Sequence, residues 1–276
     1  MSAGLLHLTK HHGLGNDFLV LLDPAPDLDA AALARAVCDR RFGVGADGLL
    51  IARPGVDGAD VTMELRNADG GRAEMSGNGI RCFAQAVWDA GLSPADRPLL
   101  VATDAGLRLV RPVAAPAAPP AGPAPAATIH AAVDMGTVKV GEDAPEWVTG
   151  SVQAAVHVDV GNPHLVLLDP DVDQVDVGER GPAIEATFPD GVNIEWIRPG
   201  PGPDELTLRV WERGAGATLA CGTGSCAAAA AANHWGRVGA QALVHNPGGD
   251  VTVELGATAV LIGPAVRVAA VEFSWR

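Results

Sequence analysis

The sequence lacks the long apolar segment that a membrane span requires. Its longest uninterrupted apolar run covers positions 226–232, whereas a transmembrane helix needs about 20 such residues. The N-terminus, MSAGLLHLTK, also lacks the charged-then-apolar build of a signal peptide. These two absences predict a cytoplasmic protein with no membrane partner.

The sequence also has few basic residues and no pattern typical of a metal-binding site. The chain has 19 basic and 33 acidic residues, a net charge of −14, which argues against a nucleic acid partner. It has four cysteines but no Cys-x-x-Cys pattern, and no histidine pair stands at ligand spacing. We therefore expect free thiols and no metal site.

Three common catalytic and nucleotide-binding motifs are missing. Residues 11–16 (HHGLGN) begin like a phosphate-binding loop, but Phe18 stands where a third glycine would be needed. The Walker pattern is absent, and Ser76 follows Glu74 and Met75, so it forms no Gly-x-Ser-x-Gly elbow. A nucleotide cofactor and a serine-hydrolase site are therefore poorly supported.

The length of 276 residues predicts two domains, with a seam near the middle. Residues 112–126 contain six prolines and are expected to form a linker or an exposed loop. This divides the chain into halves at 1–126 and 127–263. Each half contains many short strand patterns and about one long helix, which indicates an α+β fold.

One motif occurs in both halves. EMSGNGIRCFAQAVWDAG and LACGTGSCAAAAAANHWG each place a nucleophile-type residue before Gly-x-Gly and a helical segment. Ser76 and Cys221 head the two copies, 145 positions apart, and Asn16 and Asn162 lie 146 positions apart. We expect helices to begin after Ser76 and after Cys221, with the alanine-rich segment 226–232 buried.

The repeated motif suits proton transfer at a carbon beside a carboxylate. A helix N-terminus has free N–H groups and a positive dipole end, so it binds carboxylates, and it lowers the pKa of a cysteine. Two such sites facing each other across a cleft would place Ser76 and Cys221 on opposite faces of one α-carbon. This geometry is typical of a racemase or an epimerase.

The motifs HGLGNDF, RNADGGRAEMSGNGIRC, GNPH, GVNIEW and ERGAGATLACGTGSCAA resemble those of the diaminopimelate epimerase family, over nearly the whole chain. The resemblance implies an enzyme without pyridoxal phosphate or any other cofactor that converts LL- to meso-2,6-diaminopimelate for lysine and peptidoglycan synthesis. It implies a homodimer and two pseudo-symmetric domains, each a mostly antiparallel sheet wrapped round a central helix. It also implies that the last strand, within 264–276, packs on the first half.

The resemblance assigns roles by position. Ser76 and Cys221 occupy the two catalytic positions, and His164 is expected near them. The residues expected to contact the substrate's polar ends are Asn16, Asn67, Asn162 and Asn193. Glu212 and Arg213 would hold its distal amino acid group. Donors to the reacting carboxylate would come from Gly77, Asn78, Gly222 and Thr223.

Ser76 departs from the family, which has cysteine at this position. A hydroxyl is a far weaker acid than a thiol and is no ready base without a partner. The serine is compatible with an engineered replacement, a natural homologue of reduced or altered activity, or a one-base enzyme that uses Cys221 alone. Two other functions stay open: an inactive or binding-only paralogue, and a racemase or dehydratase for another amino acid in the proline racemase-like superfamily. Glu212 and Arg213 favour diaminopimelate, because a smaller substrate has no second amino acid centre for them to hold.

Overall fold

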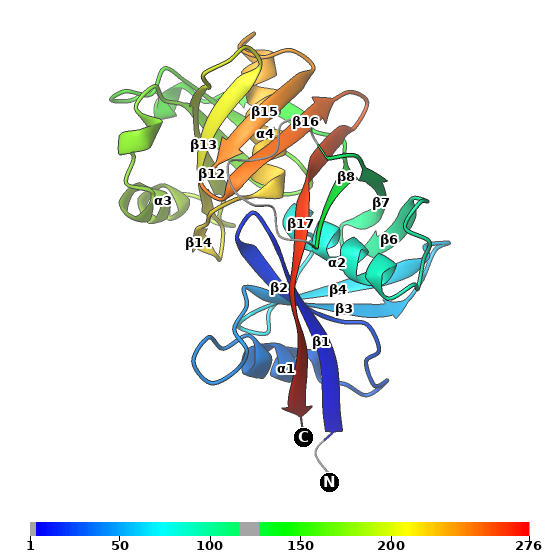
Figure 1. Cartoon of the computed structure of the whole chain (residues 1–276). Helices are drawn as coiled ribbons and strands as arrows, with labels where there is room; N and C mark the ends of the chain where they lie inside the picture. Colours follow the sequence, from blue (N-terminus) through cyan, green and yellow to red (C-terminus); the bar gives the residue numbers. More distant parts are fainter. Residues whose placement is uncertain (1–3, 116–126, 276) are drawn as a thin grey trace. The chain divides into compact units, whose positions relative to one another are not determined.

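The computed structural model describes residues 4–115 and 127–275, which form two compact units (Figure 1). Unit 1 contains the chain up to Val133 together with the segment from Pro264 onward, and unit 2 contains Asp134–Gly263. The boundaries therefore fall inside two strands, β8 (Thr128–Gly136) and β17 (Ala259–Trp275).

Most strands of unit 1 lie in the first 113 residues of the chain. Its elements among the described residues are β1 (Gly4–Gly13), β2 (Asn16–Leu21), α1 (Ala30–Val37), β3 (Gly48–Pro54), β4 (Val61–Asn67), β5 (Arg72–Ala73), α2 (Gly77–Asp89), β6 (Leu99–Thr103) and β7 (Gly106–Val113), with parts of β8 and β17. Asp29 caps α1, since its side chain accepts a hydrogen bond from the Ala32 N–H.

Unit 2 repeats the same succession of elements. Those among the described residues are β9 (Lys139–Asp143), a 3₁₀ turn (Pro145–Trp147), β10 (Ala154–Asp159), β11 (Pro163–Leu168), a second 3₁₀ turn (Val172–Gln174), α3 (Val177–Glu185), β12 (Asn193–Pro199), β13 (Glu205–Glu212), β14 (Gly216–Ala217), α4 (Gly222–His234), β15 (Gln241–Asn246) and β16 (Gly249–Leu255).

The two units share their strand pairing as well as their order. β2 runs parallel to β3 in unit 1, and β11 runs parallel to β12 in unit 2. Antiparallel pairing of β3 with β4 is matched by β12 with β13, and a short parallel pairing of β4 with β6 is matched by β13 with β15. The bounds of β12 and α4 lie 145 positions after those of β3 and α2. This agreement confirms the α+β fold with pseudo-symmetric domains.

Each unit is built around one helix. In unit 1, α2 contacts β1, β2 and β7, and all its residues from Gly77 to Trp88 are buried. In unit 2, α4 contacts β9 to β13, β15 and β16, which enclose it (Figure 1). Every residue of the segment 226–232 is buried, which confirms the prediction. Alanine side chains let so many strands approach a single helix closely.

Some sequence-based boundaries were wrong. Pro112 and Val113 belong to β7 and not to a linker, while residues 116–126 lie outside the described part of the chain. Pro112 is tolerated because the pairing of β7 with β6 ends at Val110, so no bond to β6 is lost.

Other elements were missed or divided. The last strand, expected within 264–276, begins earlier: β17 runs without a break from Ala259 to Trp275 and includes Pro264. The strands β8 and β9 were not predicted. Helix α3 was also missed, because Pro182 stands inside it and masks its pattern. Within the described ranges, no helix is long and apolar enough to cross a membrane.

Candidate functional site

In unit 1, Ser76 is the N-cap of α2, as predicted. Its backbone is extended (φ −140°, ψ 120°), and its Oγ accepts a hydrogen bond from the Gly79 N–H at 3.0 Å. Gly79 is itself tightly enclosed, since a Cβ at this position would lie 3.0 Å from the Ser76 Cβ. Among the described residues of unit 1, no imidazole, amine or carboxylate hydrogen-bonds to the Ser76 hydroxyl.

A hydrogen-bonded chain runs from the interior of α2 to Asn16. Arg81, fully buried, donates to the Gly77 carbonyl at 2.9 Å and to Asn78 Oδ1 at 2.7 Å. Asn78 Nδ2 donates to Asn16 Oδ1 at 3.3 Å, and Asn16 Nδ2 donates to Asp47 Oδ2 at 2.8 Å. The structure therefore joins two predicted substrate residues, Asn16 and Asn78, with fixed amide orientations.

Asn67 is the exposed last residue of β4 and stands opposite Gly48 of β3. Its backbone N–H donates to the Gly71 carbonyl at 2.9 Å, which closes the turn that leads to α2. The backbone of Asn67 is thus fixed by the local turn, and the residue is exposed.

In unit 2, Cys221 is the N-cap of α4 and has the same backbone conformation as Ser76 (φ −121°, ψ 121°). Its sulfur accepts a hydrogen bond from the Gly224 N–H at 3.3 Å and lies 3.5 Å from Thr223 Oγ1. Only 4% of the residue is exposed. Gly222 and Thr223 form the first turn beside it, as predicted.

The electrostatic surroundings of Cys221 are acidic. Burial, followed by the charges of Glu212 and Glu195, raises the pKa of the Cys221 thiol well above its ordinary value, while Thr223 and Gly224 oppose the shift. The expectation that the helix N-terminus would lower this pKa is wrong, because desolvation and two carboxylates outweigh the helix end.

Glu212 lies against the thiol. Burial raises the pKa of its carboxyl, against the opposing effect of hydrogen bonds from Thr218 and Cys221. The Thr218 hydroxyl donates to Glu212 Oε1. The resemblance implies that Glu212 holds the distal end of a substrate, yet its carboxylate is engaged by these two side chains. Glu212 and Cys221 together can hold a proton and pass it between oxygen and sulfur.

His164 and Asn162 form a second cluster in the same unit. His164 is buried on β11, and its Nδ1 lies 2.7 Å from Oε1 of Glu195 on β12. Its Nε2 lies 2.9 Å from Asn162 Oδ1. Asn162 is therefore oriented by the imidazole.

Asn193 and Arg213 meet at the adjacent ends of β12 and β13. Asn193 Nδ2 donates to the Pro163 carbonyl at 2.9 Å, and its Oδ1 accepts from the Arg213 backbone N–H at 3.0 Å. The exposed Arg213 side chain donates to the Asp190 carbonyl at 3.2 Å. Asn193 thus links the adjacent ends of β12 and β13, and the guanidinium of Arg213 lies at the surface.

Sequence reasoning missed Glu195 and Thr218. Glu195 lies within the GVNIEW motif, and a lone carboxylate inside an otherwise apolar strand is the signal that could have identified it. Thr218 carries no such signal, because its partnership with Glu212 depends on how β13 and β14 pair.

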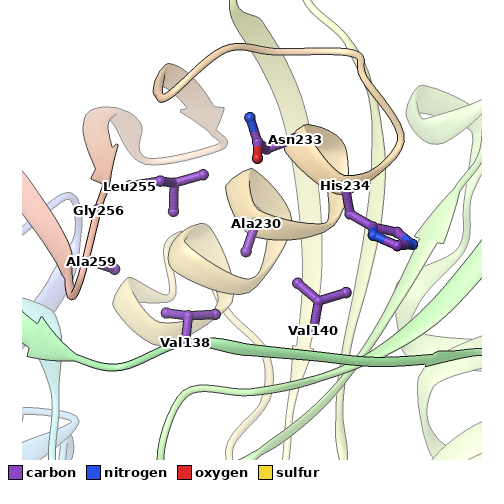
Figure 2. Close-up of a pocket in the computed structure, with 8 residues that line it drawn as sticks. All are labelled: Val138, Val140, Ala230, Asn233, His234, Leu255, Gly256 and Ala259. Atoms are coloured by element: carbon purple, nitrogen blue, oxygen red, sulfur yellow. The ribbon is translucent and has the colours of Figure 1, made fainter.

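A shallow pocket of about 260 Å³ lies elsewhere in unit 2, at the C-terminal end of α4 (Figure 2). Ala230, Asn233 and His234 of the helix line it, with Val140 and Leu255 from the neighbouring strands. None of the predicted site residues lines this pocket. We assign it no part in the chemistry.

Sequence comparison gives one family. The family model described as "Diaminopimelate epimerase" matches residues 8–115 and 156–268. A diaminopimelate epimerase of Desulfitobacterium hafniense is 41% identical, over 95% of this chain and 96% of that protein. One from Moorella thermoacetica is 40% identical, over 95% and 97% of the two chains.

Solved structures with low sequence identity share the fold. A phenazine biosynthesis protein of the PhzF family from Bacillus anthracis has a TM-score of 0.76 at 16% identity, covering 98% of this chain and 99% of its own. A hydroxyproline epimerase from Agrobacterium vitis has a TM-score of 0.70 at 17% identity, covering 99% and 92%. These similarities concern the architecture alone.

Proposed function

Because this chain belongs to the diaminopimelate epimerase family, we propose that it acts on LL- and meso-2,6-diaminopimelate by proton transfer at an α-carbon, with Ser76 limiting its turnover. The observation that carries the proposal is the buried Cys221 thiol at the N-terminus of α4, whose ionisation is opposed by the nearby Glu212 carboxyl.

The reaction follows from these groups. The α-carboxylate binds at a helix N-terminus, where free N–H groups stabilise the negative charge that develops as the C–H bond breaks. Cys221 first gives its proton to Glu212, and the resulting thiolate takes the α-proton of the substrate. Return of a proton to the opposite face of the carbanion inverts the centre, and return to the same face restores it.

Ser76 is the position from which we expect the opposite-face proton. A serine hydroxyl is a weak acid, and no base in unit 1 hydrogen-bonds to it among the described residues. Proton return from Cys221 is therefore faster than inversion. The enzyme should exchange the α-proton with solvent more readily than it epimerises.

The remaining roles follow from the family. We propose that Arg213 binds the distal carboxylate, and that Asn16, Asn67, Asn162 and Asn193 line the substrate. We expect the protein to act in the cytoplasm as a homodimer, in lysine and peptidoglycan precursor synthesis.

Solvent exchange at the α-carbon tests the proposal. Purified protein with LL- or meso-diaminopimelate in deuterium oxide, followed by NMR, should show α-deuterium incorporation exceeding epimerisation. Cys221→Ala should lose both activities and serves as the matched control. Absence of exchange, together with no calorimetric binding at millimolar ligand, would contradict the assignment.

A further inference from the structure

Glu195 is a buried carboxylate for which the proposed reaction has no role. It is fully buried on β12, and its Oε2 has no hydrogen-bond partner within residues 4–115 and 127–275. An ionised carboxylate out of water is unfavourable unless it is paired. Its partner is His164, also fully buried, with Nδ1 and Oε1 2.7 Å apart.

The hydrogen bonds of His164 determine how many protons the pair holds. Asn162 Oδ1 is an acceptor, so His164 Nε2 carries a hydrogen and donates it across 2.9 Å. The contact between Nδ1 and Glu195 then contains one proton, on either nitrogen or oxygen. The pair is neutral in both forms, and Glu195 fixes which ring nitrogen faces Asn162.

Glu195 also lies against the first turn of α4. A Cβ built on Gly224 would lie 2.7 Å from Glu195 Oε1 and 3.3 Å from Cys221 Sγ. The carboxylate oxygen and the sulfur are therefore no more than 6.0 Å apart, the sum of these distances. At that separation a carboxylate in a buried site acts strongly on a thiol.

We propose that Glu195 is a positioning residue of the unit 2 half-site: through His164 it orients the Asn162 amide, and directly it opposes ionisation of Cys221. The proposal rests on the proposed function only in treating Asn162 as a substrate residue. Glu195 touches no reacting atom. Its carboxylate keeps the sulfur protonated until Glu212 accepts the proton.

Alkylation of Cys221 tests the effect on the thiol without any need for substrate. The titratable groups facing the sulfur within unit 2 are Glu212 from β13, Glu195 from β12 and, behind it, His164 from β11. Glu195→Gln keeps the shape and replaces the carboxylate, the acidic member of the pair with His164, by a neutral amide. We expect iodoacetamide to modify Cys221 at least about threefold faster at pH 7.5, because thiolate rises tenfold per unit fall in pKa.

A second histidine–carboxylate pair supplies the control. Glu205 Oε2 lies 3.2 Å from His245 Nε2 at the opposite end of β13 from Glu212. Glu205→Gln should leave the alkylation of Cys221 unchanged. Mass mapping separates Cys221 from the other cysteines, and Cys221→Ala identifies its peptide.

Nitrogen-15 NMR of His164 tests the positioning role. In the unaltered protein we expect one proton on Nε2 and a second proton, shared between Nδ1 and Glu195, that is protected from exchange. Glu195→Gln should leave one proton on the ring. His164→Gln identifies the signals by their loss.

The results that would contradict this proposal differ from those that would contradict the proposed function. A bare Nε2 in the unaltered protein, or no protected proton between Nδ1 and Glu195, would overturn the proposal even if Glu195→Gln does not fold. Equal alkylation of Cys221 in the unaltered protein, Glu195→Gln and Glu205→Gln would do the same. Failure of the proposed function would appear separately, as absence of diaminopimelate binding and exchange with these thiol and imidazole signals intact.

Discussion

The N-termini of α2 and α4 have the same backbone geometry and opposite electrostatic surroundings. Ser76 and Cys221 are both extended N-caps whose side chains accept from the third helical N–H. Five residues further on, α2 has the buried cation Arg81, where α4 has Cys226. The two units therefore share the geometry of the capped helix end and differ in the ionisable groups around it.

The strands beside the helices show the same divergence. With the offset of 145, the acidic residues Glu195 and Glu212 of unit 2 correspond to Leu50 and Asn67 of unit 1. Unit 2 therefore has carboxyl groups around a thiol. In unit 1 the corresponding helix end has the Asn78 amide, which accepts a hydrogen bond from the buried guanidinium of Arg81. If the proposed function holds, we expect proton transfer to depend mainly on unit 2.

The strongest test of this difference is Ser76→Cys. A thiol at the N-cap of α2 would supply the acid for the opposite face, and general acid–base groups contribute about 10²–10⁴-fold. We expect epimerisation to rise at least about a hundredfold, measured by NMR or by a coupled assay on LL-diaminopimelate. Equal rates in the two proteins would refute the limiting role of Ser76.

The next test compares the two buried helix positions. Arg81→Met removes the buried guanidinium that donates to Gly77 O, Asn78 Oδ1 and Pro264 O. We expect the free energy of unfolding to fall by about 3 kcal/mol. Cys226→Ala should lower it by only about 1 kcal/mol, because it removes little more than one sulfur atom. Urea unfolding followed by circular dichroism measures both; similar losses would mean that the two positions are equivalent.

A third test concerns the surface cation that follows Glu212. Arg213 corresponds to Ala68 in unit 1, so the contact with a distal carboxylate that we propose for Arg213 has no counterpart at that position. Arg213→Ala should weaken diaminopimelate binding about 10- to 100-fold, as for a hydrogen bond from a charged group. Calorimetry measures the change. The control, Arg209→Ala, removes an arginine of the same strand that pairs with Asp173, and it should bind normally.

The sequence predicted the scaffold well and its electrostatics poorly. Gly-x-Gly after Ser76 and Cys221 located both N-caps, because glycines and capping residues act locally. The continuity of β17 was missed, since Pro264 disfavours a strand unless neighbouring segments pair around it. The raised pKa of the Cys221 thiol was missed because Glu195 and Glu212 come from strands whose register depends on long-range pairing.

The smallest expected effect compares Gly224→Ala with Gly79→Ala. Each glycine is the third residue of its helix, where alanine is intrinsically better by about 0.5–1 kcal/mol. In unit 2 the added methyl would lie 2.7 Å from Glu195 Oε1, which His164 holds in place. In unit 1 it would lie 3.0 Å from the Ser76 Cβ and 3.3 Å from the Phe18 ring, a contact that small shifts relieve.

We therefore expect Gly79→Ala to be nearly neutral and Gly224→Ala to be destabilising by about 1–2 kcal/mol, which is typical of an overpacked core. Thermal unfolding should show a midpoint several degrees lower for Gly224→Ala. Combining it with Glu195→Ala should remove most of this loss, because the obstructing carboxylate is then absent and the two changes are not additive. If Gly79→Ala is the more harmful change, or the loss at Gly224 persists without Glu195, the carboxylate is not what packs against the first turn of α4.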